Sequence, residues 1–176
     1  MEFVLKDQKI NFDPQALKVI ANASAGGLRD ALSILDQAVA VSKDGSITLD
    51  DAYEITGSSR IDQQIDFVAS LLKTDMRQAF SIISDILSSG KDPLKFAQDL
   101  LVLFKNLILI KSSPELVNSQ SIDRIKKLSE DHSNRVFEKL IDLTADSLAK
   151  MKQSVRPDLY LEILAVKGSE LVTDRI

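Results

Sequence analysis

The sequence predicts an all-α protein built from two helical domains. Apolar residues recur at the three- and four-residue spacings of amphipathic helices along almost the whole chain, and no run alternates long enough to indicate a strand. Aromatic residues make up only 5% of the 176 residues, and there is no tryptophan, which is little for a β-sandwich core. Hydrophobic residues at 44% and charged residues at 27% are ordinary proportions for a globular protein.

The first helices are marked by their start and stop signals. Residues 4–10 are compatible with the end of a helix. Asp13 and Pro14 predict a helix start, because Asp caps free N–H groups and Pro is preferred at the first helical position. That helix is expected to end near Ser24. The next one, over residues 28–41, has apolar residues on two sides and is expected to be buried on two sides.

The middle of the chain repeats these signals. Residues 48–51 resemble a capping box and open a short helix that ends at Gly57. Two longer helices follow, and Thr74 is expected to cap the second of them. The pair Asp92–Pro93 starts a helix over residues 94–111 whose C-terminal half is apolar almost all round. We therefore expect it at the centre of a bundle, with Leu101, Phe104 and Ile108 covered.

Three more helices are predicted towards the C-terminus, over residues 122–128 and 133–151 and from Pro157 onwards. A change in charge balance along the chain predicts a domain boundary near residue 58. Residues 1–58 contain five basic and nine acidic residues, which gives 5 − 9 = −4, whereas residues 59–176 contain seventeen of each. An overall charge of −4 makes the chain a poor candidate for a main DNA-binding surface, because duplex binding relies on neutralising phosphates.

Several kinds of site are excluded by composition. Without cysteine there is no disulfide, thiolate nucleophile, iron–sulfur cluster or cysteine-bound zinc, and His132 as the single histidine excludes a catalytic triad and multi-histidine metal sites. We therefore expect no metal site and a solvated loop position for His132. The longest apolar run, residues 100–110, is broken by Lys105 and Asn106, so no membrane span is expected, and the charged N-terminus is unlike a signal peptide.

No catalytic residue is predicted either, because the sequence has no phosphate-binding glycine loop and no metalloprotease motif. The basic group Arg124, Lys126 and Lys127 has acids around it and is expected to form a solvated helix face.

Arg29 is the residue whose position opposes local preference. It falls in the first turn of a helix that follows Gly26 and Gly27, where a cation opposes the helix dipole at a cost of about 0.3–1 kcal/mol. A bound anion would reverse that cost, because the guanidinium, the dipole and the free N–H groups would converge on it. The alternative is an ion pair of Arg29 with Asp30 or another neighbouring acid.

The segment 26–38, GGLRDALSILDQA, resembles the sensor 2 segment of the gamma/tau subunits of bacterial DNA polymerase III, which are AAA+ ATPases of the clamp loader. The flanks are also similar to this family: residues 47–57 match its last lid helix, and residues 156–163 its proline-led final collar helix. Gly168 stands where the family's last helix usually has an apolar residue, a departure that bears on where this helix ends.

The resemblance implies a AAA+ lid domain over residues 1–58 and a helical collar, or oligomerisation, domain over residues 59–176. It implies that Arg29 contacts the γ-phosphate of ATP, with Gly26, Gly27 and Leu28 close to the nucleotide. It further implies oligomer contacts in the final helix, at Pro157, Leu159, Leu161 and Glu162.

The family's phosphate loop, magnesium motif, zinc module and arginine finger have no counterpart in this sequence. The resemblance therefore implies that ATP and Mg are bound mainly by a domain upstream, and we expect no ATPase or polymerase activity and no cofactor for this chain alone. The implied partners are further gamma/tau copies, delta and delta-prime, with the sliding clamp and primed DNA reached through the whole complex, in the bacterial cytoplasm. The alternatives are a helical adaptor that binds no nucleotide, or the corresponding region of another replication-associated AAA+ protein.

Overall fold

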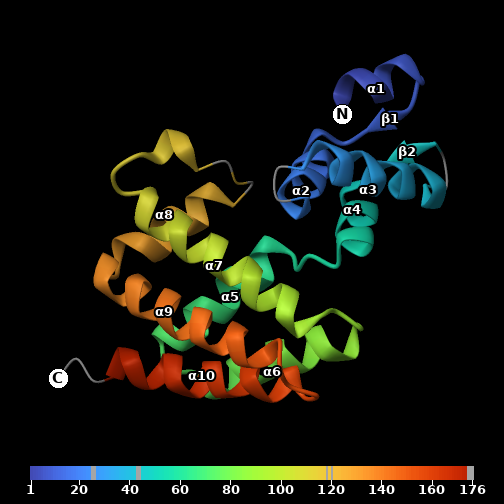
Figure 1. Ribbon diagram of the computed structural model, residues 1–176. Coiled ribbons are helices and arrows are strands. Elements are labelled where there is room, and N and C mark those ends of the chain that lie inside the picture. Colours follow the sequence, from blue (N-terminus) through green and yellow to red (C-terminus); the bar gives the residue numbers. More distant parts are fainter. Residues whose placement is uncertain (25–26, 43–44, 118, 120, 174–176) are drawn as a thin grey trace. The chain divides into compact units, whose positions relative to one another are not determined.

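The computed structural model describes residues 1–24, 27–42, 45–117, 119 and 121–173 (Figure 1). The chain forms two compact units, unit 1 over Met1–Ser58 and unit 2 over Ser59–Ile176. Nearly all of the described residues outside turns are helical, which confirms the predicted all-α class.

The helices described in unit 1 are α1 (Glu2–Asp7), α2 (Pro14–Ala23), α3 (Leu28–Val41) and α4 (Leu49–Thr56). Their ends follow the predicted signals. The Asp13 carboxylate accepts the N–H of Gln15 at 2.8 Å and so caps α2. In the capping box of α4, the Thr48 hydroxyl accepts the N–H of Asp51 at 3.2 Å, and the Asp51 carboxylate accepts the N–H of Thr48 at 2.8 Å.

Unit 1 also contains a minimal parallel sheet, which the sequence did not lead us to expect. Strand β1 (Asn11–Phe12) pairs with β2 (Ser46–Ile47), and the N–H of Asp13 extends the pairing to the carbonyl of Ile47 at 2.9 Å. The prediction that no strand is present is therefore wrong at this point. Two residues per strand are too few to produce an alternating pattern, and the partners are far apart in the sequence.

The core of unit 1 lies between its helices, and its fully buried residues include Leu5, Ile20, Leu35 and Ile47. Along α3, Ala31, Leu35 and Ala38 are buried, whereas Leu32, Ile34 and Val39 are only partly buried and Val41 is exposed. The expectation of burial on two sides is therefore only partly met. One face of α3 therefore remains open.

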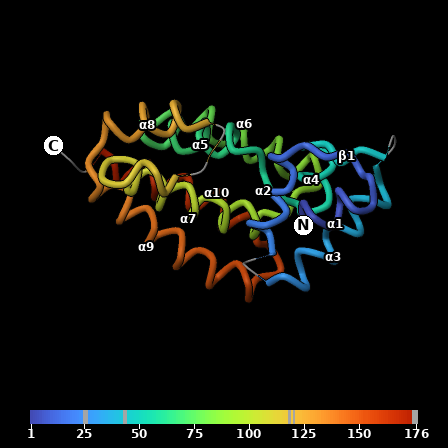
Figure 2. The backbone as a smooth tube through the Cα atoms, turned by 90° about the horizontal axis from the view of Figure 1, so that it is seen from above, coloured from blue at the N-terminus to red at the C-terminus, as the bar shows by residue number. Residues whose placement is uncertain are grey.

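Unit 2 is a helical bundle. Its described helices are α5 (Ile61–Leu72), α6 (Met76–Ser88), α7 (Pro93–Leu109), α8 (Ile122–Glu130), α9 (Asn134–Met151) and α10 (Pro157–Thr173), with a short 3₁₀ helix η1 (Pro114–Leu116) before α8. Helix α7 packs against α5, α8, α9 and α10, and α9 lies alongside both α7 and α10 (Figures 1 and 2). Its place at the centre of the bundle agrees with the prediction.

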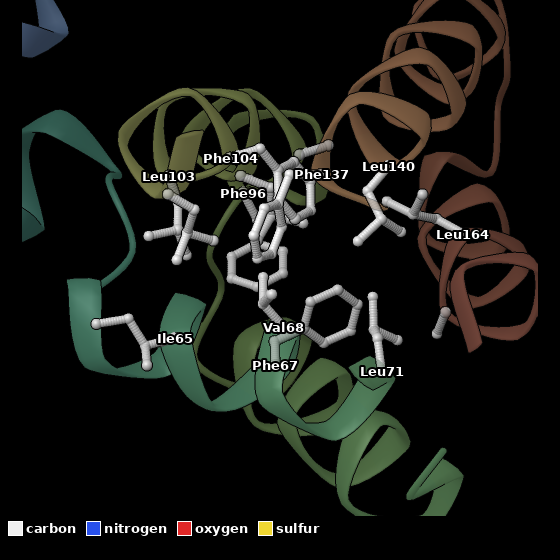
Figure 3. Close-up of a cluster of buried hydrophobic side chains, with 14 of the residues drawn as sticks. Ile65, Phe67, Val68, Leu71, Phe96, Leu103, Phe104, Phe137, Leu140 and Leu164 are labelled. Atoms are coloured by element: carbon white, nitrogen blue, oxygen red, sulfur yellow. The ribbon is translucent and has the colours of Figure 1, made fainter. Parts of the chain in front are cut away.

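Buried aromatic rings fill the centre of this bundle. The Phe67 ring of α5 meets the Phe96 ring of α7 edge to face, with 5.3 Å between centroids (Figure 3). Phe104 and Phe137 extend the cluster towards α9. Phe104 is buried as expected, whereas Leu101 and Ile108 are partly buried.

Helix α10 continues through Gly168 to Thr173, so the glycine does not end it. Gly168 is buried, and a Cβ atom placed on it would lie 3.1 Å from Cδ1 of Leu71 and 3.3 Å from Cδ2 of Leu140. The missing side chain therefore allows α10 to pack closely against α5 and α9.

The cap of α6 differs from the prediction. Asp75, not Thr74, is the N-cap, and its carboxylate accepts the N–H of Gln78 at 3.0 Å. Thr74 instead closes the preceding helix: it has φ 56°, and the N–H of Asp75 returns to the carbonyl of Ser70 at 2.9 Å. A β-branched residue is disfavoured in this left-handed conformation.

We expect Thr74→Gly to stabilise unit 2 by about 0.5–1 kcal/mol. The left-handed conformation costs a non-glycine residue about 1–2 kcal/mol, and the greater freedom of glycine in the unfolded chain takes back part of this gain. Denaturant unfolding measures the change. Gly90→Ala is the matched control, since Gly90 has φ 72° and the same argument predicts a loss of about 1 kcal/mol. A lower midpoint for Thr74→Gly would contradict the assignment of strain.

Candidate functional site

The N-terminal end of α3 positions Arg29. Gly27 is the N-cap, and no side chain caps the helix there. The carbonyl of Gly27 accepts the N–H of Ala31 at 2.9 Å, which begins the helical hydrogen bonding. The N–H groups of the first turn have no partner within the helix. Arg29 belongs to this same turn. Gly26 lies outside the described residues.

The surroundings of Gly27 leave little room for a side chain. Its N–H donates to the carbonyl of Ser24 at 2.8 Å, and a Cβ atom on it would lie 3.3 Å from that same oxygen and 3.0 Å from Oδ2 of Asp30. A larger residue would have to displace the Asp30 carboxylate. That carboxylate is stabilised in the first turn by the helix dipole.

The Arg29 side chain is exposed. Within the described part of the chain it makes no ion pair or hydrogen bond, so the alternative of a pair with Asp30 is not what the structure shows. Leu28 beside it is 67% exposed, an unusual position for a large apolar side chain. This arrangement can bind an anionic group such as a phosphate, because the guanidinium and the free N–H groups of an uncapped helix N-terminus are all donors.

The candidate oligomer residues separate by helix face. Leu161 is completely buried within unit 2 and packs in its core, so its predicted role in a direct contact with another subunit is wrong. Leu159 is 42% exposed, and Pro157 and Glu162 are partly exposed. Leu159 and Leu161 are two residues apart and therefore lie on nearly opposite sides of α10, which is why one is exposed and the other is buried.

Sequence reasoning missed the rest of the exposed face of α10. Ile163 and Val166 are 42% and 40% exposed, and with Leu159 they follow the i, i+4, i+7 spacing of one helix side. We call these three residues the α10 stripe. The signal was present in the sequence, because α10 is apolar on more than one side and a single core can cover only part of it.

The other candidate polar residues have structural roles. Arg124 is not simply solvated: its two terminal nitrogens contact the carboxylates of Asp62 and Asp66 at 2.6 Å and join α8 to α5. His132 lies in the loop between α8 and α9, as expected, but it is partly buried, with its ring edge-on to Phe137 at 6.4 Å between centroids.

Two negative findings apply to the described residues. They contain no group of three or more possible metal ligands, and no helix among them is long and apolar enough to cross a bilayer.

Comparisons with known protein families identify matches along the chain. Residues 1–44 match the family model "DNA polymerase III clamp loader subunit, ATPase lid domain", and residues 47–171 match "DNA polymerase III subunits gamma and tau domain III". The two matches meet near residue 45, whereas the compact units meet at Ser58 and Ser59.

Individual relatives agree with these families. The chain is 30% identical over 171 residues to the DNA polymerase III subunit tau of Bacillus subtilis and 25% identical over 171 residues to the gamma/tau subunit of Mycobacterium tuberculosis. These alignments cover 95% and 93% of the chain but only 30% of each relative, so the chain spans less than a third of their length. Among solved structures, the Bacillus subtilis DNA clamp loader delta protein has a similar fold, with a TM-score of 0.54 at 15% identity over 94% of this chain and 53% of that protein.

Proposed function

Since the chain belongs to the family of gamma and tau subunits of DNA polymerase III, we propose that it is the lid and collar part of a clamp-loader ATPase subunit. Unit 1 is the AAA+ lid, over residues 1–58, and unit 2 is the collar, over residues 59–176. The whole complex uses ATP to load the sliding clamp onto primed DNA, and this chain senses the nucleotide state and assembles the subunit ring.

The observation that carries the proposal is the exposed, unpaired Arg29 at the uncapped N-terminus of α3, within the described part of the chain. Its guanidinium contacts the γ-phosphate of ATP, and the backbone at Gly27 and the side chain of Leu28 lie close to the nucleotide. ATP and Mg are held mainly by another domain of the full-length subunit, because this sequence has no phosphate loop. The chain alone is therefore not an enzyme.

The α10 stripe supports the assembly role. A contiguous apolar helix side on the surface is typical of a protein contact, and the equal numbers of acidic and basic residues in residues 59–176 avoid strong repulsion between identical units. The partners are further gamma/tau copies and the delta and delta-prime subunits, in the cytoplasm. The similar fold of a clamp-loader delta protein is consistent with a ring of related subunits.

The chain itself offers a test. Added during assembly, it should enter clamp-loader complexes in place of full-length gamma/tau and reduce clamp loading, because it brings a collar without a site for ATP hydrolysis. We expect Leu159→Asp to weaken this inhibition by about tenfold or more, since burying an unpaired carboxylate in an apolar contact costs several kcal/mol. Loading assays with increasing amounts of chain measure the effect.

Leu116→Asp is the matched control, because Leu116 is also an exposed leucine of unit 2, at 64%, but belongs to η1. It should inhibit like the unchanged chain. Equal inhibition by all three proteins would exclude the α10 stripe from the contact, and no inhibition by the unchanged chain would argue against the collar function itself.

A further inference from the structure

The backbone between the two units is anchored on both sides of a single residue. On the side of unit 1, the N–H of Ser58 donates to the hydroxyl of Thr56 at 3.3 Å, and that hydroxyl donates to the carbonyl of Ala52 at 2.7 Å. Helix α4 thus holds the chain as far as the peptide group that precedes Ser58.

Unit 2 holds the chain from the next peptide group onwards. Oδ2 of Asp99, on α7, accepts the N–H of Ser59 at 3.0 Å and its hydroxyl at 3.1 Å. The side-chain amide of Gln64, on α5, donates to the carbonyl of Ser59 at 3.0 Å and to its Oγ at 2.9 Å. We call Ser59, Gln64 and Asp99 the Ser59 latch.

The latch is largely buried, and its charged member Asp99 keeps 13% of its side chain exposed. Ser59 is 3% exposed and Gln64 6%, and the other oxygen of Asp99 faces the Lys95 ammonium at 3.3 Å. Burial raises the pKa of Asp99, while Lys95 and the hydrogen bonds from Ser59 act in the opposite direction. An apolar residue at position 99 would avoid the cost of removing a carboxylate from water. The hydrogen bonds that Asp99 accepts from Ser59 are what the carboxylate provides in return.

We propose that the Ser59 latch restricts movement between the two units to one residue. Since the peptide groups before and after Ser58 are each fixed to a different unit, the only free backbone rotations between them are φ and ψ of Ser58. A joint with two free torsions allows fewer relative orientations of the units than a longer unanchored linker would. This inference concerns the joint alone and does not depend on nucleotide binding by Arg29.

Spin labelling tests the joint on the chain as it is. The sequence has no cysteine, so Ser33→Cys on α3 and Ser84→Cys on α6, both exposed, introduce one nitroxide site in each unit. Double electron–electron resonance then gives the distribution of distances between the units. We expect Asp99→Ala to broaden this distribution roughly twofold, because the free torsions of the joint rise from two to four.

Asp146→Ala is the matched control, since Asp146 is an exposed aspartate of the same unit, on α9, and it should leave the width unchanged. Circular dichroism reports whether Asp99→Ala is folded. If it is not, Asp99→Leu, which also removes the acceptor for the N–H of Ser59 but fills more of the space that the carboxylate leaves, takes its place and should broaden the distribution. An unchanged width in a folded latch variant would overturn the proposal.

Discussion

Arg29→Ala in a full-length gamma/tau subunit that contains this chain should lower ATP-driven clamp loading by about 10- to 100-fold. The lost contact is a charge-assisted hydrogen bond to the γ-phosphate, and such bonds contribute about 1.5–3 kcal/mol. Each 1.36 kcal/mol in the barrier changes a rate tenfold. Loading of the clamp onto primed DNA, measured with reconstituted complexes, gives the result.

The same substitution should barely affect folding. Arg29 is exposed and has no partner in the described part of the chain, so we expect a change in the free energy of unfolding of no more than about 0.5 kcal/mol. Arg29→Lys is the conservative control: it keeps the charge but not the planar guanidinium, and should retain part of the loading. A fragment destabilised by several kcal/mol, with near-normal loading, would show instead that Arg29 is a structural residue.

Phe67→Ala should destabilise unit 2 by about 3–5 kcal/mol, the usual cost of deleting a buried phenylalanine ring. Phe67 is completely buried, and the substitution removes the edge-to-face contact with Phe96 at the centre of the bundle (Figure 3). Because small domains are stable by only about 5–15 kcal/mol, this loss should shift the denaturant midpoint strongly.

Phe80→Ala is the matched control for Phe67→Ala. Phe80 lies on α6 in the same unit but is 38% exposed, so its removal should cost only about 1 kcal/mol. Similar losses for the two variants would mean that the Phe67–Phe96 contact is not the centre of the core.

Features encoded by neighbouring residues were predictable from the sequence. The Asp–Pro starts of α2 and α7 and the capping box of α4 follow from side chains within three residues of the groups they cap. The uncapped start of α3 was predictable for the same reason, because a glycine at its N-cap offers no capping side chain.

Features that depend on contacts distant in the sequence were not predictable. Strands β1 and β2 are two residues each and meet only in the folded chain. Arg124 looks like part of a solvated basic face until α8 packs against α5 and brings Asp62 and Asp66 to it. Leu161 and Leu159 are both apolar, and only the packing of α10 decides which of them faces the core.

The most direct test of the central claim is the preference of the full-length subunit for ATP over ADP. The equilibrium affinities of both nucleotides, measured by titration for the unchanged protein and for Arg29→Ala, separate the γ-phosphate contact from general nucleotide binding. We expect Arg29→Ala to weaken ATP binding by about 10- to 100-fold and to leave ADP binding nearly unchanged, because ADP lacks the phosphate that Arg29 contacts. An equal effect on both nucleotides, or no effect on either, would contradict the sensor role of Arg29.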